Sequence, residues 1–130
     1  MLRKAFLIRR MTLSAVNRRK YREIETNDEF VKHVINSEYP VVVNFHADWC
    51  EPCKKLTPTL KEMIEPLNDV NLAIVDVEKH PELVESFEVK AVPAVVALRH
   101  GQVIDKFIGL VEKDMITKLM EKLGSNKSSD

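Results

Sequence analysis

The chain has 130 residues, of which 45% are hydrophobic, and this size and composition predict a single globular domain. Residues 1–22 hold eight of its 20 basic residues and none of its 20 acidic ones, so the rest of the chain is strongly acidic. An acidic body argues against a domain that binds nucleic acid through its phosphates, and we expect no such partner. No apolar stretch approaches the length of a transmembrane helix, so we also expect no membrane partner.

A basic leader, residues 1–20, precedes the region in which regular elements are predicted. It is rich in arginine, free of acidic residues and interspersed with large apolar side chains, a composition typical of a mitochondrial transit peptide. Its longest uncharged apolar run, residues 5–8, is too short for a secretory signal. Cleavage is expected between Arg10 and Tyr21; a basic tail without an address, or one that binds nucleic acid, is the alternative.

Hydrophobic periodicity and turn residues predict elements in the order β-α-β-α-β-α-β-β-α. Strands are expected at 21–26, 41–45, 71–77, 94–98 and 102–108. Helices are expected at 27–35, from about 48–52 to 67, at 80–87 and at 111–123, where Gly124 would end the last helix and leave a flexible tail at 124–130. Residues 41–45 are almost uniformly apolar, as in a central strand covered on both faces. The order predicts an α/β domain over 21–123, with a central mixed sheet flanked by helices.

The two cysteines of the chain, Cys50 and Cys53, lie one helical turn apart at a predicted helix start, with Pro52 in the first turn. This spacing lets them form a disulfide or separate as thiols with little change in the backbone. The partial positive charge at a helix N-terminus favours a thiolate. Cys50 is therefore predicted to be the exposed nucleophile, and Cys53 the deeper thiol that resolves a mixed disulfide.

A metal site is the main alternative for a Cys-x-x-Cys pair, because such a pair supplies half of a structural zinc site. The sequence has no second cysteine pair, and His46, on the preceding strand, is more easily explained as a packed core residue. We therefore expect no metal. His33, His80 and His100 lack a pattern of partner residues and are expected at the surface.

The segment VVVNFHADWCEPCKKLTPTL, residues 41–60, resembles the active-site segment of thioredoxins, whose usual form is an apolar strand followed by Trp-Cys-Gly-Pro-Cys-Lys. The segment KAVPA, residues 90–94, is similar to the loop in which that family has a cis-proline, here Pro93. Gly101 and Gly109 match two further family positions, and the resemblance extends over residues 21–123. The sequences FHA and VIDKFIGL are most similar to mitochondrial members.

The resemblance implies the thioredoxin fold and the role of a protein disulfide reductase in the mitochondrial matrix. Cys50 would attack a target disulfide, Cys53 would release the reduced target, and a flavin-containing, NADPH-dependent thioredoxin reductase would restore the dithiol. Peroxiredoxins would be among the targets, and the chain itself would act as a monomer without a cofactor. The family positions that dock targets are occupied here by Trp49, Pro52, Val92, Pro93 and Gly109.

Three departures from the family pattern are expected to modulate the chemistry. Asn44 stands where most thioredoxins have a buried Asp that helps the second cysteine to exchange its proton, and Ile74 stands where many have a Lys. Losing both avoids leaving one buried charge unpaired, so we expect slower resolution or an altered pH dependence. Glu51 replaces the usual Gly; its carboxylate favours the helix start but disfavours a thiolate at Cys50.

Two other functions are compatible with the same fold. Isomerases and oxidases of the family commonly have His before the second cysteine, where this chain has Pro52. The alternative to catalysis is a thioredoxin-fold binding module without turnover, which the presence of both cysteines, Trp49 and Pro93 disfavours.

Overall fold

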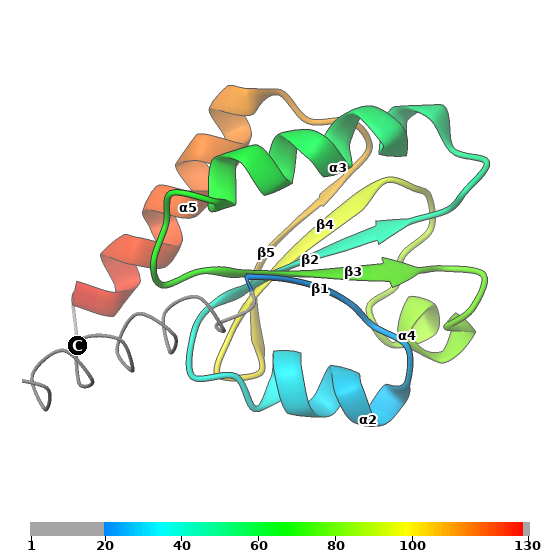
Figure 1. Ribbon diagram of the computed structural model, residues 1–130, viewed down its shortest axis with the longest axis horizontal. Helices are drawn as coiled ribbons and strands as arrows, with labels where there is room; N and C mark the ends of the chain where they lie inside the picture. Colours follow the sequence, from blue (N-terminus) through cyan, green and yellow to red (C-terminus); the bar gives the residue numbers. More distant parts are fainter. Residues whose placement is uncertain (1–19, 129–130) are drawn as a thin grey trace, which may run out of the picture.

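The computed structural model describes residues 20–128, in which a five-stranded mixed sheet carries helices on both faces (Figure 1). The strands are β1 (Tyr21–Glu23), β2 (Val41–His46), β3 (Asn71–Asp76), β4 (Ala94–Arg99) and β5 (Gln102–Ile108). The helices are α2 (Asn27–Phe30), which continues as the π-helical segment η1 (Val31–Ile35), then α3 (Glu51–Ile64), α4 (Pro81–Ser86) and α5 (Lys113–Ser128). The predicted order of elements and the predicted mixed α/β architecture are confirmed.

Strand β2 lies at the centre of the sheet, whose strand order is β1-β3-β2-β4-β5. It pairs in parallel with β3 and antiparallel with β4, while β1 is parallel to β3 and β5 is antiparallel to β4. Its first five residues are all buried, which confirms the prediction drawn from the apolar run at 41–45. Because β2 is the middle strand, the loop that follows it and leads to α3 lies at the middle of one edge of the sheet, where the carboxyl end of β2 is.

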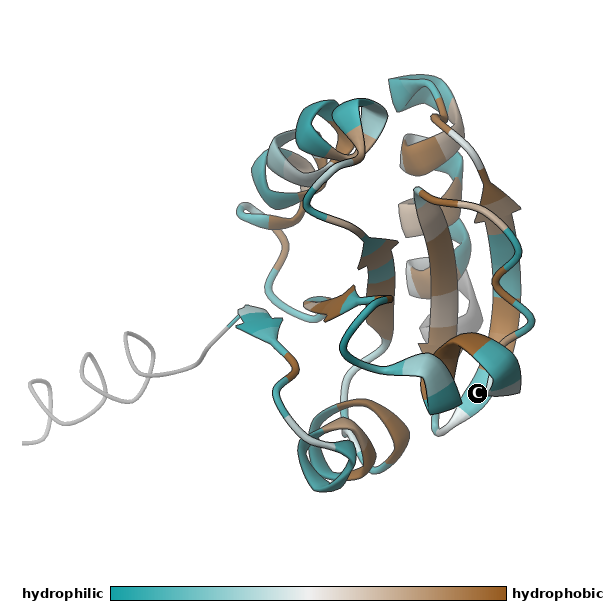
Figure 2. Cartoon of the chain, turned by 90° about the vertical axis from the view of Figure 1, so that its right-hand side faces the viewer, coloured by the Kyte–Doolittle hydropathy of each residue, from teal (hydrophilic) through white to brown (hydrophobic). Residues whose placement is uncertain are grey.

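The sheet separates two apolar cores, because successive side chains of a strand point to opposite faces. On one face Val42 packs with buried leucines and isoleucines of α3 and α5. On the other face Val43 and Phe45 pack with side chains of α2, η1 and α4. Figure 2 shows the hydrophobic residues along the strands and the polar residues on the outer sides of the helices.

The helix boundaries follow the prediction closely at 27–35, although the second half of that segment is π-helical, with the N–H of Asn36 donating to the carbonyl oxygen of Val31 at 2.9 Å. The end predicted for the last helix is wrong, since α5 continues through Gly124 to Ser128. A glycine ends a helix when it takes the left-handed conformation, and Gly124 does not take it.

The predicted leader lies almost entirely outside the described residues, so the transit peptide stays a prediction, as does the tail at 129–130. None of the helices in the described part of the chain combines the length and the apolar character that crossing a bilayer requires.

Candidate active site

Cys50 occupies the N-cap of α3, directly after the loop that leaves the central strand β2. Its backbone is extended, and its Sγ accepts a hydrogen bond from the backbone N–H of Cys53 at 3.2 Å. Pro52 lies in the first turn, where the absence of an N–H costs no helical hydrogen bond. The sequence therefore places one sulfur at the positive end of the helix dipole, as predicted.

The two cysteines form a disulfide, with 5.3 Å between their Cα atoms. Only 3% of Cys50 and 2% of Cys53 is exposed, because Ala47, Val77 and Val92 pack around them. The prediction of an exposed Cys50 is therefore wrong for this oxidised state. The predicted positions of the two cysteines on the helix are nevertheless confirmed, since Cys50 caps α3 and Cys53 lies one turn inside it.

Trp49 stands out from the surface beside the disulfide, with 65% of the residue exposed. Its indole Nε1–H donates to Oε2 of Glu78 at 3.2 Å, which orients the ring. Next to the ring lies a hollow of about 180 Å³ lined mainly by apolar side chains, including Val77, Val84 and Val92. Glu78 was not singled out by sequence reasoning, because nothing in the pattern indicates that this residue faces Trp49 across 29 positions.

The bond between Val92 and Pro93 is cis, which confirms the expectation drawn from the resemblance. Val92 packs against the two cysteines, and the carbonyl oxygen of Pro93 accepts a hydrogen bond from the N–H of Gly109 at 2.7 Å. Gly109 has a φ of 99°, a conformation that side chains disfavour. The fold thus packs Val92 against the disulfide, and Pro93, the next residue, joins Gly109 through the backbone.

Asn44 is fully buried on β2. Its Nδ2 donates to Oγ1 of Thr57 on α3 at 2.8 Å, while its Oδ1 has no hydrogen-bond partner among the described residues. Its register neighbours are Ile74 on β3 and Val95 on β4, both buried. The two departures noted in the sequence, Asn44 and Ile74, therefore lie side by side.

Glu51, the residue between Cys50 and Pro52, points into solvent and forms an ion pair with Nζ of Lys54 at 3.2 Å. Both side chains are more than half exposed, so the pair contributes little to stability. Its predicted effect on the Cys50 thiolate stays a prediction.

His46 lines an open cleft of about 310 Å³ together with Cys53 and Thr57. Within residues 20–128 no three His, Cys, Asp or Glu side chains are grouped so that they could hold a metal ion.

The surface position predicted for His80 is wrong: it is 7% exposed, and its Nε2 donates to the carbonyl oxygen of Ile24 at 2.9 Å. A buried carbonyl at the end of β1 needs a donor, and the tertiary fold brings His80 there. His100 is exposed, as predicted.

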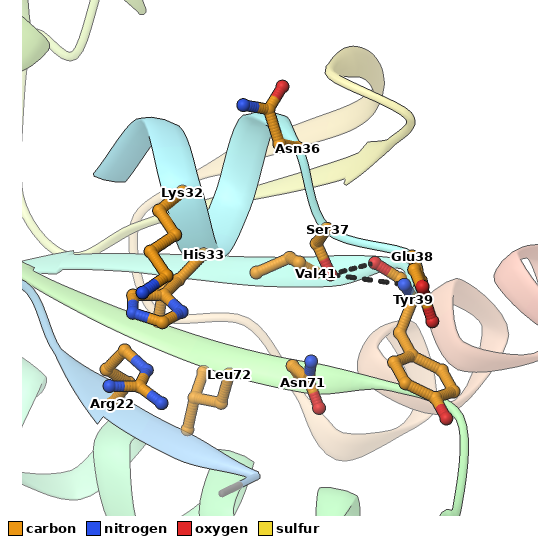
Figure 3. A pocket seen from close by; sticks show the side chains of 11 residues that line it. Arg22, Lys32, His33, Asn36, Ser37, Glu38, Tyr39, Val41, Asn71 and Leu72 are labelled. Atoms are coloured by element: carbon orange, nitrogen blue, oxygen red, sulfur yellow. Dashed lines mark hydrogen bonds between the residues drawn. The ribbon is translucent and has the colours of Figure 1, made fainter. Parts of the chain in front are cut away.

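A separate hollow of about 320 Å³ lies where β2 and β3 begin, at the opposite end of the strands from the cysteines (Figure 3). Arg22, Lys32 and His33 gather at one end of it, and the hydroxyl of Ser37 bonds the backbone of Tyr39 at the other. Neither cysteine lines this hollow, so it is not part of the candidate active site.

Comparisons with known proteins agree with this geometry. Residues 22–122 match a family model described as thioredoxin. The mitochondrial thioredoxin of Mus musculus is 43% identical over 101 residues, which are 77% of this chain and 61% of that protein. A thioredoxin of Chlamydia muridarum is 32% identical over 100 residues, covering 77% of this chain and 96% of that protein.

Among solved structures, a mutant thioredoxin from Halobacterium salinarum superposes with a TM-score of 0.73 at 27% identity, covering 80% of this chain and 90% of that chain. The chain spans less than two thirds of the length of its mitochondrial relatives from Mus musculus, Rattus norvegicus and Bos taurus.

Proposed function

The chain belongs to the thioredoxin family and has the thioredoxin fold, and from this premise we propose that it reduces disulfide bonds in other proteins with Cys50 and Cys53 as a reversible dithiol. The observation that carries the proposal is the position of the pair. Cys50 caps the N-terminus of α3 and accepts the N–H of Cys53, which stabilises negative charge on its sulfur.

The chemistry proceeds by two exchanges of thiol and disulfide. The Cys50 thiolate attacks one sulfur of the target disulfide; a bond forms to Cys50, and the other target sulfur leaves as a thiolate that takes up a proton. The Cys53 thiolate then attacks Sγ of Cys50, closes the internal disulfide and expels the second target sulfur. Two electrons pass from the dithiol to the target, and an NADPH-dependent thioredoxin reductase returns them.

Target docking is assigned to the surface around the disulfide. Trp49 supplies an exposed aromatic face, and the hollow beside it supplies apolar walls. Val92 and Pro93 flank the cysteines, while Pro52 is exposed on the first turn of α3. An extended segment of a target, with its cysteine over Cys50, would lie across these residues and along the edge near Gly109.

The mitochondrial matrix is the proposed location, with peroxiredoxins among the targets and the monomer as the working state. The support for the location is the arginine-rich leader, residues 1–20, together with similarity to proteins described as mitochondrial thioredoxins. The location is tested by expressing the chain with a fluorescent protein fused to its carboxyl terminus, with and without residues 2–19. Loss of mitochondrial fluorescence on deletion supports it, and unchanged distribution contradicts it.

The activity is tested by following NADPH consumption with thioredoxin reductase and insulin as the disulfide substrate. The wild-type chain should turn over, Cys50→Ser should abolish turnover, and His100→Gln, an exposed change in the turn between β4 and β5, should leave it intact. Absence of turnover in the wild type, with two reduced thiols confirmed, would sink the proposal. Partner capture by Cys50→Ser without wild-type turnover would instead indicate a binding module.

A further inference from the structure

The cleft behind the disulfide joins Cys53 to a histidine that the steps above do not use. His46 is the last residue of β2 and lies two positions after Asn44, so both side chains point to the face of the sheet that α3 covers. The cleft, of about 310 Å³, is lined by His46 and Cys53 together with Thr57, Pro58 and Lys61 of α3. This volume accommodates several water molecules between the two side chains.

Resolution of a mixed disulfide requires that Cys53 lose its proton, because only a thiolate attacks a disulfide efficiently. Cys53 is 2% exposed, and the small part of it that meets solvent in this state lines the cleft. Asn44, the buried polar residue on the same strand, has an amide that neither accepts nor releases a proton near neutral pH. The proton therefore needs an acceptor that lines the cleft.

The cleft offers three kinds of titratable side chain. An ammonium group has no lone pair with which to accept a proton, which disfavours Lys54 and Lys61 as acceptors. A carboxylate is a weaker base than an imidazole, which disfavours Glu23 and Asp48. An imidazole is the side chain type that exchanges a proton between pH 5 and 8, and His46 is the imidazole that lines this cleft.

The charges that face His46 come from every neighbouring element. Acidic side chains lie on β1, on the segment after it, on the loop before α3 and on β3, where Asp76 is the register partner of His46. Basic side chains lie on α3 and on the segment after β3. Among residues 20–128, the charged side chains that line this cleft and the adjoining one are Glu23, Glu25, Asp48 and Asp76, together with Lys54, Lys61 and Lys79. Charges of both signs therefore face His46.

From this arrangement we infer that His46 accepts the proton of Cys53, through water in the shared cleft, during the second exchange. The inference rests on the disulfide reductase function proposed above. In the mixed disulfide the Cys53 S–H bond breaks and its proton passes to the neutral imidazole. The thiolate forms a bond to Sγ of Cys50, and the bond from Cys50 to the target sulfur breaks. The target sulfur leaves with the electron pair and is protonated by the imidazolium or by solvent.

The second exchange can be isolated by mixing the reduced full-length chain with one molar equivalent of dithiobis-nitrobenzoate. Attack by Cys50 releases one coloured thionitrobenzoate, and attack by Cys53 on the resulting mixed disulfide releases a second. Cys53→Ser should stop after one equivalent and so identifies the phases. His46→Gln is compared with the wild type from pH 5.5 to 9.5, with His46→Asn as a second variant and His100→Gln as an exposed control.

We expect His46→Gln and His46→Asn to slow the second phase about tenfold or more at pH 7, since general base catalysis contributes typically 10²–10⁴-fold. The first phase should keep its rate, which also shows that the variants fold. At the alkaline end of the range the difference should narrow, because hydroxide then competes as the base. Added imidazole should speed the second phase of both variants and leave the wild type unchanged.

The inference is overturned if either His46 variant matches the wild type at pH 7, or if both are slower by one constant factor at every pH. A constant factor would mean that His46 only shapes the cleft. These measurements need neither the reductase nor a protein target. A wild type that releases both equivalents but fails to reduce insulin would therefore refute the proposed function while leaving the role of His46 measurable.

Discussion

Asn44→Asp would place a carboxyl group in a buried site whose two neighbours on the adjacent strands are apolar. Asn44 is 0% exposed, its register neighbours are Ile74 and Val95, and its Nδ2 donates to the hydroxyl of Thr57. Desolvation penalises the charged form of an acid, so we expect the carboxyl to remain protonated in the folded protein well above the pH at which it ionises in the unfolded chain.

The size of the effect follows from burial. Full burial raises a carboxyl pKa from about 3.9 to about 7, and each pH unit corresponds to ~1.4 kcal/mol. Over that window the folded state binds a proton that the unfolded state has lost, so stability falls as the pH rises. Relative to the wild type, the variant should lose about 4 kcal/mol of unfolding free energy at pH 7 and little at pH 4.

The assay is urea unfolding of the oxidised proteins, followed by far-ultraviolet circular dichroism at pH 4, 5, 6 and 7. Asn68→Asp is the matched control, because Asn68 is exposed in the bend after α3 and its carboxylate would stay hydrated. Its unfolding free energy should follow the wild type at each pH. If Asn44→Asp also runs parallel to the wild type from pH 4 to 7, the site accommodates charge and the reasoning is refuted.

Two further predictions concern stability. Leu60→Ala should cost about 2–5 kcal/mol of unfolding free energy by urea titration, since Leu60 of α3 is fully buried in the core that α3 shares with the sheet and α5. Leu110→Ala, at a residue 55% exposed, should cost far less, and similar losses in the two variants would contradict this description of the core. Burial and then the neighbouring Glu65 carboxylate raise the pKa of Tyr21 to about 12. The stabilisation that comes from the protonated Tyr21 hydroxyl is thus complete below pH 10 and declines as the pH rises toward 12. The wild type should therefore lose unfolding free energy relative to Tyr21→Phe between pH 9.5 and 12, and a difference that stays constant would count against the interaction.

The elements of the fold were predictable because local patterns are strong in this chain. The run at 41–45, apolar except for Asn44, is typical of a strand covered on both faces, and β2 is that strand. Apolar and polar residues tend to alternate over 102–108, as in a strand with one covered face, and β5 has those bounds. Helix ends were less predictable. Gly124 ends a helix only if its backbone takes the left-handed conformation, and no local pattern settles whether it does.

In the candidate site, the sequence predicted the cysteine pair and its helix cap, since Pro52 and the i, i+3 spacing are local features. The burial of Cys50 was not predictable, because Val77 and Val92, which cover it, come from other segments of the chain. The bond from Trp49 to Glu78 depends likewise on a contact between the loop before α3 and the segment after β3.

Residues close together in the sequence were therefore enough to predict which segments form strands and helices, and that the cysteine pair lies at a helix start. These properties depend on residues within one or two turns of each other. Only the folded chain shows that His80 supplies a donor to Ile24, that Asn44 lies beside Ile74, and that His46 shares a cleft with Cys53. Each of these contacts depends on strand register and helix packing, which bring together residues that are far apart in the sequence, and no local sequence pattern predicts such contacts.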